Sequence, residues 1–211
     1  MRCATVVLCS ALFITARSAA QICSGEPTFT GSSTRVFASV AFGQYQTYHG
    51  GVTLGGRRVF GWAEGGMATR GSDQSTQYYV GGGVQLDQRP DSRLHICPEV
   101  LLGRTAVTNA GVTTISFAEY TAAAGVDVGY VVLHKGATRI VPTTNVQFVT
   151  GQMHLKYING VRRTHGIASY GLLGAGIGFG FGEFTASPGF IFPLGLEGAK
   201  IATVIAFSVR L

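Results

Sequence analysis

Apolar and polar residues alternate along most of this chain, with the period of two that is typical of β-strands. The closing segment is a clear case, because Thr203, Ile205, Phe207, Val209 and Leu211 alternate with smaller or polar residues. Clusters rich in Gly, Ser, Asn and Asp separate similar segments from residue 35 onward. The pattern predicts about ten strands, at 35–47, 51–58, 60–70, 77–87, 94–105, 113–133, 139–155, 167–181, 185–196 and 201–211.

The two faces of the clearest strands differ in composition. One face is apolar, with the rows Tyr78, Val80, Val84 and Leu86, then Leu94, Ile96, Val100 and Leu102, then Tyr120, Val126, Val128, Tyr130 and Val132. The other face is rich in Gly, Thr and Ala with isolated acids, which suits a narrow packed interior better than a water-exposed surface. We therefore expect an all-β, antiparallel up-and-down transmembrane barrel, with its apolar face against lipid.

An even number of strands would return both ends of the barrel segment to the same side of a membrane. Short separators around 57–58, 88–93, 134–138 and 182–184 are predicted to be periplasmic turns. Longer ones at 71–76, 108–112 and 157–166 are predicted to be outward loops. Tyr48, Trp62, Tyr120 and Tyr130 lie near predicted strand ends, where either an aromatic belt or ordinary strand propensity places such residues.

The first residues have the features of a secretory signal peptide. Arg2 precedes an apolar run over 4–15, and small residues at 18–20 offer a cleavage site. That run is shorter than the ~20 residues that a transmembrane helix needs. We expect a signal peptide at 1–20, a periplasmic tail at 21–33 and an outer-membrane barrel at 34–211.

Composition supports a membrane barrel over a soluble domain. The chain has 31 Gly and only 12% charged residues, where ~25% is usual for soluble proteins. Removing Arg2 and Arg17 with the signal peptide leaves 16 − 2 = 14 basic against 10 acidic residues, a net charge of +4. The basic residues are scattered and no nucleic-acid motif accompanies them, so no nucleic-acid partner is expected.

Two cysteines, Cys23 and Cys97, remain after the signal peptide. Disulfides persist in exported proteins, so either a Cys23–Cys97 bridge or two separate thiols fits the sequence.

The hairpin segments resemble the small outer-membrane β-barrel family of Gram-negative bacteria, which includes the OmpA transmembrane domain, OmpX-like proteins and opacity-type antigens. The resemblance covers residues 34–211 and rests on pairs such as ICPEVLLG with AAAGVDVGY, and on the closing TVIAFSVRL. The family usually has eight strands and an aromatic last residue, where this chain has an added hairpin and Leu211. The resemblance implies no cofactor and no catalysis, only an anchor, a surface scaffold or a narrow pore.

The same resemblance implies the partners. Phe207, Val209 and Leu211 would be recognised by the barrel assembly machinery, and the folded protein would contact outer-membrane lipid and lipopolysaccharide. We expect a monomer.

Several charged residues are candidates for a lumen polar cluster, namely Glu99, Glu119, Asp127, Arg104 and Arg139, with Gln147 as a further partner. Buried charges are normally retained only when they are paired. Because small barrels have interiors just wide enough for side chains, we favour a structural plug over a conducting, cation-selective pore.

The five histidines show no metal spacing and no recognisable catalytic arrangement, so no catalytic, cofactor or metal site is predicted. The segment KYINGVRRTHG is the most basic stretch, and its Lys156, Arg162, Arg163 and His165 are candidate surface-loop contacts. Anionic headgroups are one possible ligand, and a solvated loop tip without a ligand explains the same charges.

Four functions remain open: a structural or surface-interaction barrel, a narrow porin-like channel for small solutes, a lipid-modifying outer-membrane enzyme, and a soluble exported barrel of the lipocalin type. We favour the first of these, a non-catalytic integral membrane barrel.

Overall fold

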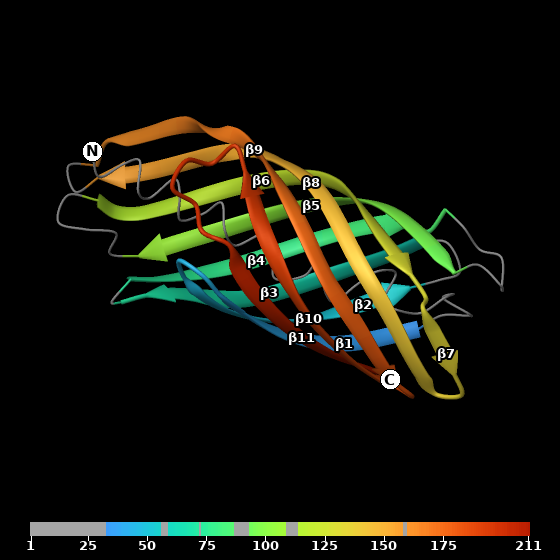
Figure 1. Ribbon diagram of the computed structural model, residues 1–211. Helices are drawn as coiled ribbons and strands as arrows, with labels where there is room; N and C mark the ends of the chain where they lie inside the picture. The colour runs from blue at the N-terminus through green and yellow to red at the C-terminus, as the bar shows by residue number, and fades with distance from the viewer. Residues whose placement is uncertain (1–32, 56–58, 72, 87–92, 109–113, 158–159) are drawn as a thin grey trace.

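The computed structural model describes residues 33–55, 59–71, 73–86, 93–108, 114–157 and 160–211 (Figure 1). The predicted signal peptide and nearly all of the predicted tail lie outside these ranges. The described residues form strands, turns and bends. None of their segments is a helix long and apolar enough to cross a membrane.

Eleven strands form one antiparallel sheet: β1 (Ser33–Phe42), β2 (Gln46–Gly55), β3 (Val59–Arg70), β4 (Asp73–Val84), β5 (Leu94–Thr108), β6 (Thr114–Tyr130), β7 (Leu133–Lys135), β8 (Thr138–Tyr157), β9 (Arg162–Phe181), β10 (Phe184–Leu194) and β11 (Ala202–Arg210). The short β7 continues β6, because both pair with β8. The sheet closes where β1 pairs with β11. With β6 and β7 counted as one strand, the barrel has ten strands around its circumference, which we call staves. This confirms the predicted fold and strand number.

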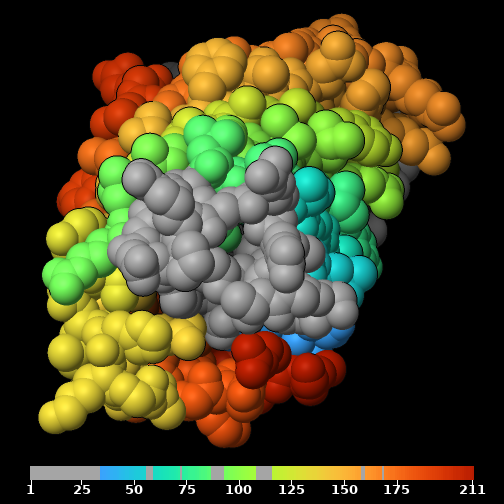
Figure 2. All heavy atoms as spheres, turned by 90° about the vertical axis from the view of Figure 1, so that its right-hand side faces the viewer, coloured from blue at the N-terminus to red at the C-terminus, as the bar shows by residue number. Residues whose placement is uncertain are grey.

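The first strand begins and the last strand ends at the same end of the barrel (Figure 1). We call this end the closing end, and the other the far end. Viewed onto the closing end, the yellow β7–β8 hairpin projects from the rim beside the orange and red of the last strands (Figure 2). The described strands therefore have the even number predicted from the sequence, which returns both ends of the barrel segment to the same side.

Two strand boundaries differ from the prediction at tight connections. The predicted strand 35–47 is interrupted at Gly43, because Phe42 pairs directly with Gln46 and the chain reverses between them. The predicted loop 71–76 is mostly strand, since Arg70 pairs directly with Asp73 next to Gly71 with φ of 59°. Polar residues continue the ladder here, and so hydrophobicity alone did not detect the strand.

The predicted loop 157–166 is also shorter than expected. β9 already begins at Arg162, and Lys156 pairs with Arg162 across the tip of the β8–β9 hairpin. The two strands have 20 residues each, about twice the 9–11 that a tilted transmembrane strand requires. At the far end the hairpin extends past the neighbouring β10 and β11, as the orange β9 shows in Figure 1.

The packed core of the molecule lies in the barrel lumen. It contains large side chains from strands all around the wall, including Phe60, Trp62, Tyr79, Leu172 and Ile191. A second, smaller cluster of Phe117, Met153 and Leu155 lies on the long strands. The sequence predicted a lumen face rich in Gly, Thr and Ala with isolated acids, and most of these large side chains were not anticipated.

Candidate functional site

A histidine-centred group lies in the lumen on β2, β3 and β4. His49 Nε2 lies 2.7 Å from Gln77 Oε1 and its Nδ1 lies 3.9 Å from Glu64 Oε1. The His49 ring stacks on Tyr79, with the ring centroids 5.7 Å apart. The His49 and Glu64 side chains are 0% and 1% exposed. The group therefore has polar residues of the kind used in catalysis, but packed side chains surround it.

Sequence reasoning missed this group because its members are far apart along the chain. Each lies on a lumen-facing position, and neighbouring strands bring them together: Tyr79 is directly opposite Glu64 in the β3–β4 register. Their alternation along the strand could have indicated that they face the lumen, since Gln77 and Tyr79 alternate with the outward Tyr78 and Val80.

Glycines on neighbouring strands make room for the large lumen side chains. A Cβ on Gly103 would lie 2.4 Å from the Tyr79 ring, and one on Gly81 would lie 2.2 Å from the Trp62 ring. Real Cβ atoms do not approach so closely, and a packed interior cannot absorb the extra volume without moving these rings. Gly81 and Gly103 thus have a packing role, in which an aromatic ring fills the space that a Cβ would occupy.

The predicted lumen acids occupy two levels of the barrel. Glu119 and Asp127 are both 1% exposed, and Glu99 accepts a hydrogen bond of 2.7 Å from Gln147 Nε2. Gly125 on β6 lies between these two residues, because it is opposite Glu99 on β5 and opposite Gln147 on β8. The structure therefore brings Glu99 to the amide partner considered for it.

Arg104 was predicted for the lumen cluster, and this prediction is wrong. It alternates in phase with Val100 and Leu102, so its side chain lies on the outer face, 5.8 Å from the centroid of the Tyr120 ring. Arg139 has the lumen-facing parity of Val141 but is only half-buried near the closing end. Trp62 likewise lies in the lumen rather than in an outer aromatic belt.

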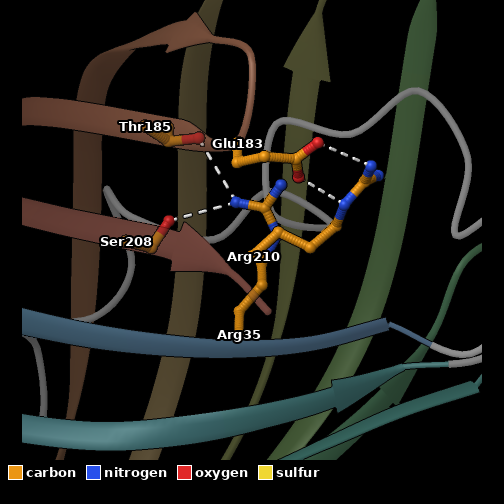
Figure 3. Close-up of polar contacts among 5 residues, drawn as sticks. All are labelled: Arg35, Glu183, Thr185, Ser208 and Arg210. Carbon is orange, nitrogen blue, oxygen red and sulfur yellow. Dashed lines mark hydrogen bonds and ion pairs between the residues drawn. The ribbon is translucent and has the colours of Figure 1, made fainter.

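A buried arginine that the sequence analysis did not single out joins three strands at the seam. Arg35 of β1 donates hydrogen bonds to Thr185 Oγ1 on β10 (3.3 Å) and Ser208 Oγ on β11 (3.1 Å). Nearby, Arg210 binds Glu183 at the rim through its guanidinium group (Figure 3). The Arg35 hydrogen bonds cross the junction where the barrel closes and stabilise the pairing of the first and last strands. The Arg210–Glu183 ion pair lies beside this junction and joins β11 to the β9–β10 turn.

The outer face of the barrel is apolar. Its exposed large residues come from every stave, and include Val36, Leu54, Val80, Val100, Leu102, Val126, Val146, Phe148, Ile177, Phe190 and Phe207. This apolar outer surface surrounds a lumen that holds both hydrophobic and polar buried side chains. A soluble barrel would instead expose mainly polar residues on its outer face. Tyr48, Tyr78, Tyr120 and Tyr130 are exposed on this surface too.

The predicted C-terminal signal residues belong to this outer surface. Phe207 and Leu211 are exposed and Val209 is half-buried. The Leu211 amide donates to the Thr34 carbonyl at 2.9 Å, so the last residue completes the seam with the first strand.

The four predicted surface contacts, Lys156, Arg162, Arg163 and His165, are all exposed at the β8–β9 hairpin. Cys97 is fully buried and disulfide-bonded. Its predicted partner, Cys23, lies outside the described residues.

No family model and no curated protein matches the sequence. Among solved structures, the chain is similar to the translocator domain of the autotransporter NalP from Neisseria meningitidis, with 11% identity, 98% of each chain covered and a TM-score of 0.53. A Bordetella autotransporter BrkA β-domain gives 14% identity, 86% and 100% coverage and 0.44. The N-terminal barrel of Pseudomonas aeruginosa OprF gives 11%, 86% and 98%, and 0.37. The NalP likeness shows the fold alone, a closed antiparallel β-barrel.

Proposed function

We propose that this chain is an integral outer-membrane β-barrel with a structural or surface-interaction role, without catalysis. The apolar outer surface carries the proposal, because exposed Val, Leu and Phe side chains on every stave need lipid rather than water around them. The barrel assembly machinery would recognise the outward Phe207, Val209 and Leu211 and insert the protein. The protein would be a monomer, and lipopolysaccharide would surround its far end.

The packed lumen supports a plugged barrel. Trp62, Tyr79, Tyr170 and Leu172 are all buried there, and an interior of this size is filled by such side chains. The His49–Glu64 pair is enclosed in the same lumen, and so a lipid bound on the outer surface would not reach it. This arrangement supports the non-catalytic role.

The test is fractionation of cells that express the full chain. We expect the protein in outer-membrane fractions, with a gel mobility that changes on boiling because a folded barrel resists detergent. Val146→Lys places a charge amid the lipid-facing surface, which costs about 2–4 kcal/mol near the bilayer midplane, whereas Leu133→Lys at the rim costs about 0–1. A soluble barrel would tolerate both substitutions equally, and that result would contradict the proposal.

A narrow channel is the second candidate, and two buried amides favour it. The side-chain nitrogens of Gln77 and Asn145 have no hydrogen-bond partner among the described residues. Buried polar groups of this kind are usually paired with ordered water, which a hydrated path would supply. Planar-bilayer recordings separate the two candidates: a plugged barrel is silent, and steady small conductance steps would favour the channel.

A further inference from the structure

A row of polar and charged side chains crosses the outer face near the far end. In the strand registers, Arg104 on β5 lies opposite Tyr120 on β6. On β8, Gln152 lies opposite Tyr120, and His154 is the next outward residue toward the far end. Two residues further along β8, Lys156 pairs with Arg162 on β9. We call Arg104, Tyr120, His154, Lys156 and Arg162 the outer ladder, and all five of these side chains are exposed.

Direct contacts hold the middle of the outer ladder together. The Arg104 guanidinium lies over the Tyr120 ring at 5.8 Å, and the His154 ring meets the same ring edge-on at 5.4 Å. His154 Nδ1 lies 3.0 Å from Thr164 Oγ1 on β9. Tyr120 therefore lies between two basic side chains and limits their freedom, which reduces the entropy lost when they bind a ligand.

Acidic side chains do not balance these charges on the same strands. The acids of β5 and β6, Glu99, Glu119 and Asp127, have lumen-facing positions. The sequences of β8 and β9 contain no Asp or Glu. The charged side chains on the outer faces of these four strands are thus all basic, a pattern that favours an anionic ligand.

The position of the outer ladder indicates where that ligand would be. On β5, Val100 and Leu102 precede Arg104 on the outer face, and on β8 Val146 and Phe148 precede His154. The outer ladder therefore begins where the apolar surface ends, and exposed Tyr78 lies directly opposite Arg104 at this border. In a membrane barrel, this border lies at the depth of the lipid headgroups.

We propose that the outer ladder binds the phosphate groups of a phosphorylated glycolipid in the leaflet that surrounds the far end. This inference rests on the proposed membrane function. Arg104 has a planar guanidinium that matches phosphate oxygens with two hydrogen bonds, and Lys156 and Arg162 add charge further along the hairpin. The apolar surface below them contacts the acyl chains of the same lipid.

The experiment measures binding of bisphosphorylated lipid A to the intact detergent-solubilised barrel by native mass spectrometry. The same lipid A without phosphates serves as the second ligand. Arg104→Gln/Lys156→Gln removes one Arg and one Lys from the ladder. Arg93→Gln/Lys135→Gln is the matched control, because it removes one exposed Arg and one exposed Lys at the closing end.

We expect the ladder variant to weaken binding of the bisphosphorylated lipid by about fivefold for each cation, on the order of 25-fold for both. The control should bind like the unmodified protein, and the phosphate-free lipid should not distinguish the variants. Equal losses in both variants, or no preference for the phosphorylated lipid, would overturn the proposal.

A folding check keeps this test separate from that of the proposed function. Both variants should retain the mobility change on boiling, since the substituted residues are exposed. If the protein is inserted in the membrane but binds lipid A equally well with and without phosphates, only the proposal for the outer ladder is refuted. A protein found outside the membrane refutes the proposed function itself.

Discussion

Arg35 and Arg210 lie directly opposite each other in the β1–β11 register, and their guanidinium groups have different environments. The Arg35 group is buried and donates to Thr185 and Ser208. The Arg210 side chain is 38% exposed and binds Glu183 at the rim. One register position of the seam thus combines a buried hydrogen-bonded cation with a surface ion pair.

This difference predicts unequal effects of the same substitution. Arg35→Met leaves two buried hydroxyls without a charged donor, and should lower the free energy of unfolding by about 2–4 kcal/mol. Arg210→Met removes an exposed pair that contributes about 0–1 kcal/mol. Urea unfolding of the barrel in lipid vesicles measures both changes, and equal effects would contradict the role of Arg35 at the seam.

Tyr78 and Tyr79 are adjacent residues with opposite environments, since Tyr78 is 55% exposed and Tyr79 is 2% exposed. Tyr79→Ala opens a cavity in the lumen, and should cost about 3–5 kcal/mol, as for other large buried rings. Tyr78→Ala should change stability by less than about 1 kcal/mol, because lipid replaces the ring. The same vesicle assay compares them, and similar losses would exclude a packed lumen at Tyr79.

Gly103→Ala should destabilise the barrel by about 1–3 kcal/mol, because the new methyl group would overlap the Tyr79 ring. Gly50→Ala is the control, since its nearest neighbour would be the Phe37 carbonyl oxygen at 3.7 Å. In a Tyr79→Ala background, the part of the Gly103→Ala cost that the ring causes should disappear, whereas the close approach to Thr121 Oγ1 at 2.6 Å remains. Additive effects in this double-mutant cycle would show that the ring does not cause the cost.

We expect the buried Cys97 to be joined to Cys23, the cysteine that remains with it after signal-peptide removal. Peptide mapping of the mature protein without reductant should find one cross-linked peptide containing both residues. Cys23→Ser should release a free thiol at Cys97, detectable by alkylation after unfolding. A Cys97 that stays unreactive in this variant would indicate a different partner.

Leu211 tests the proposed assembly signal. Leu211→Phe supplies the aromatic end that is usual in the resembled family, and should raise the fraction of folded barrel in the outer membrane. Leu211→Asp should lower it, because it places a charge at the end of the outward apolar row. The heat-modifiable fraction on a gel measures both changes. Lys200→Asp, in the β10–β11 connection, is a control with the same new side chain.

Local alternation was enough to predict the class of fold. Tyr78, Val80 and Leu102 occupy outward positions because successive side chains of a strand point to opposite faces. This rule needs no knowledge of the partner strand, and so the sequence indicated the barrel, its parity and its outer surface. It failed at Gly43, where a tight turn interrupts an unchanged residue pattern, and at Asp73, where polar residues continue the strand.

Partners across the barrel depend on register and closure, which the sequence does not encode locally. The alternation of β5 already placed Arg104 outside, but only the pairing with β6 brought it over Tyr120. His49 meets Gln77 because β2, β3 and β4 align at one level. The sequence by itself therefore determined which face each side chain takes. The tertiary structure decided which side chains meet, because contacts between strands exist only once the strand registers and the closure of the barrel are fixed.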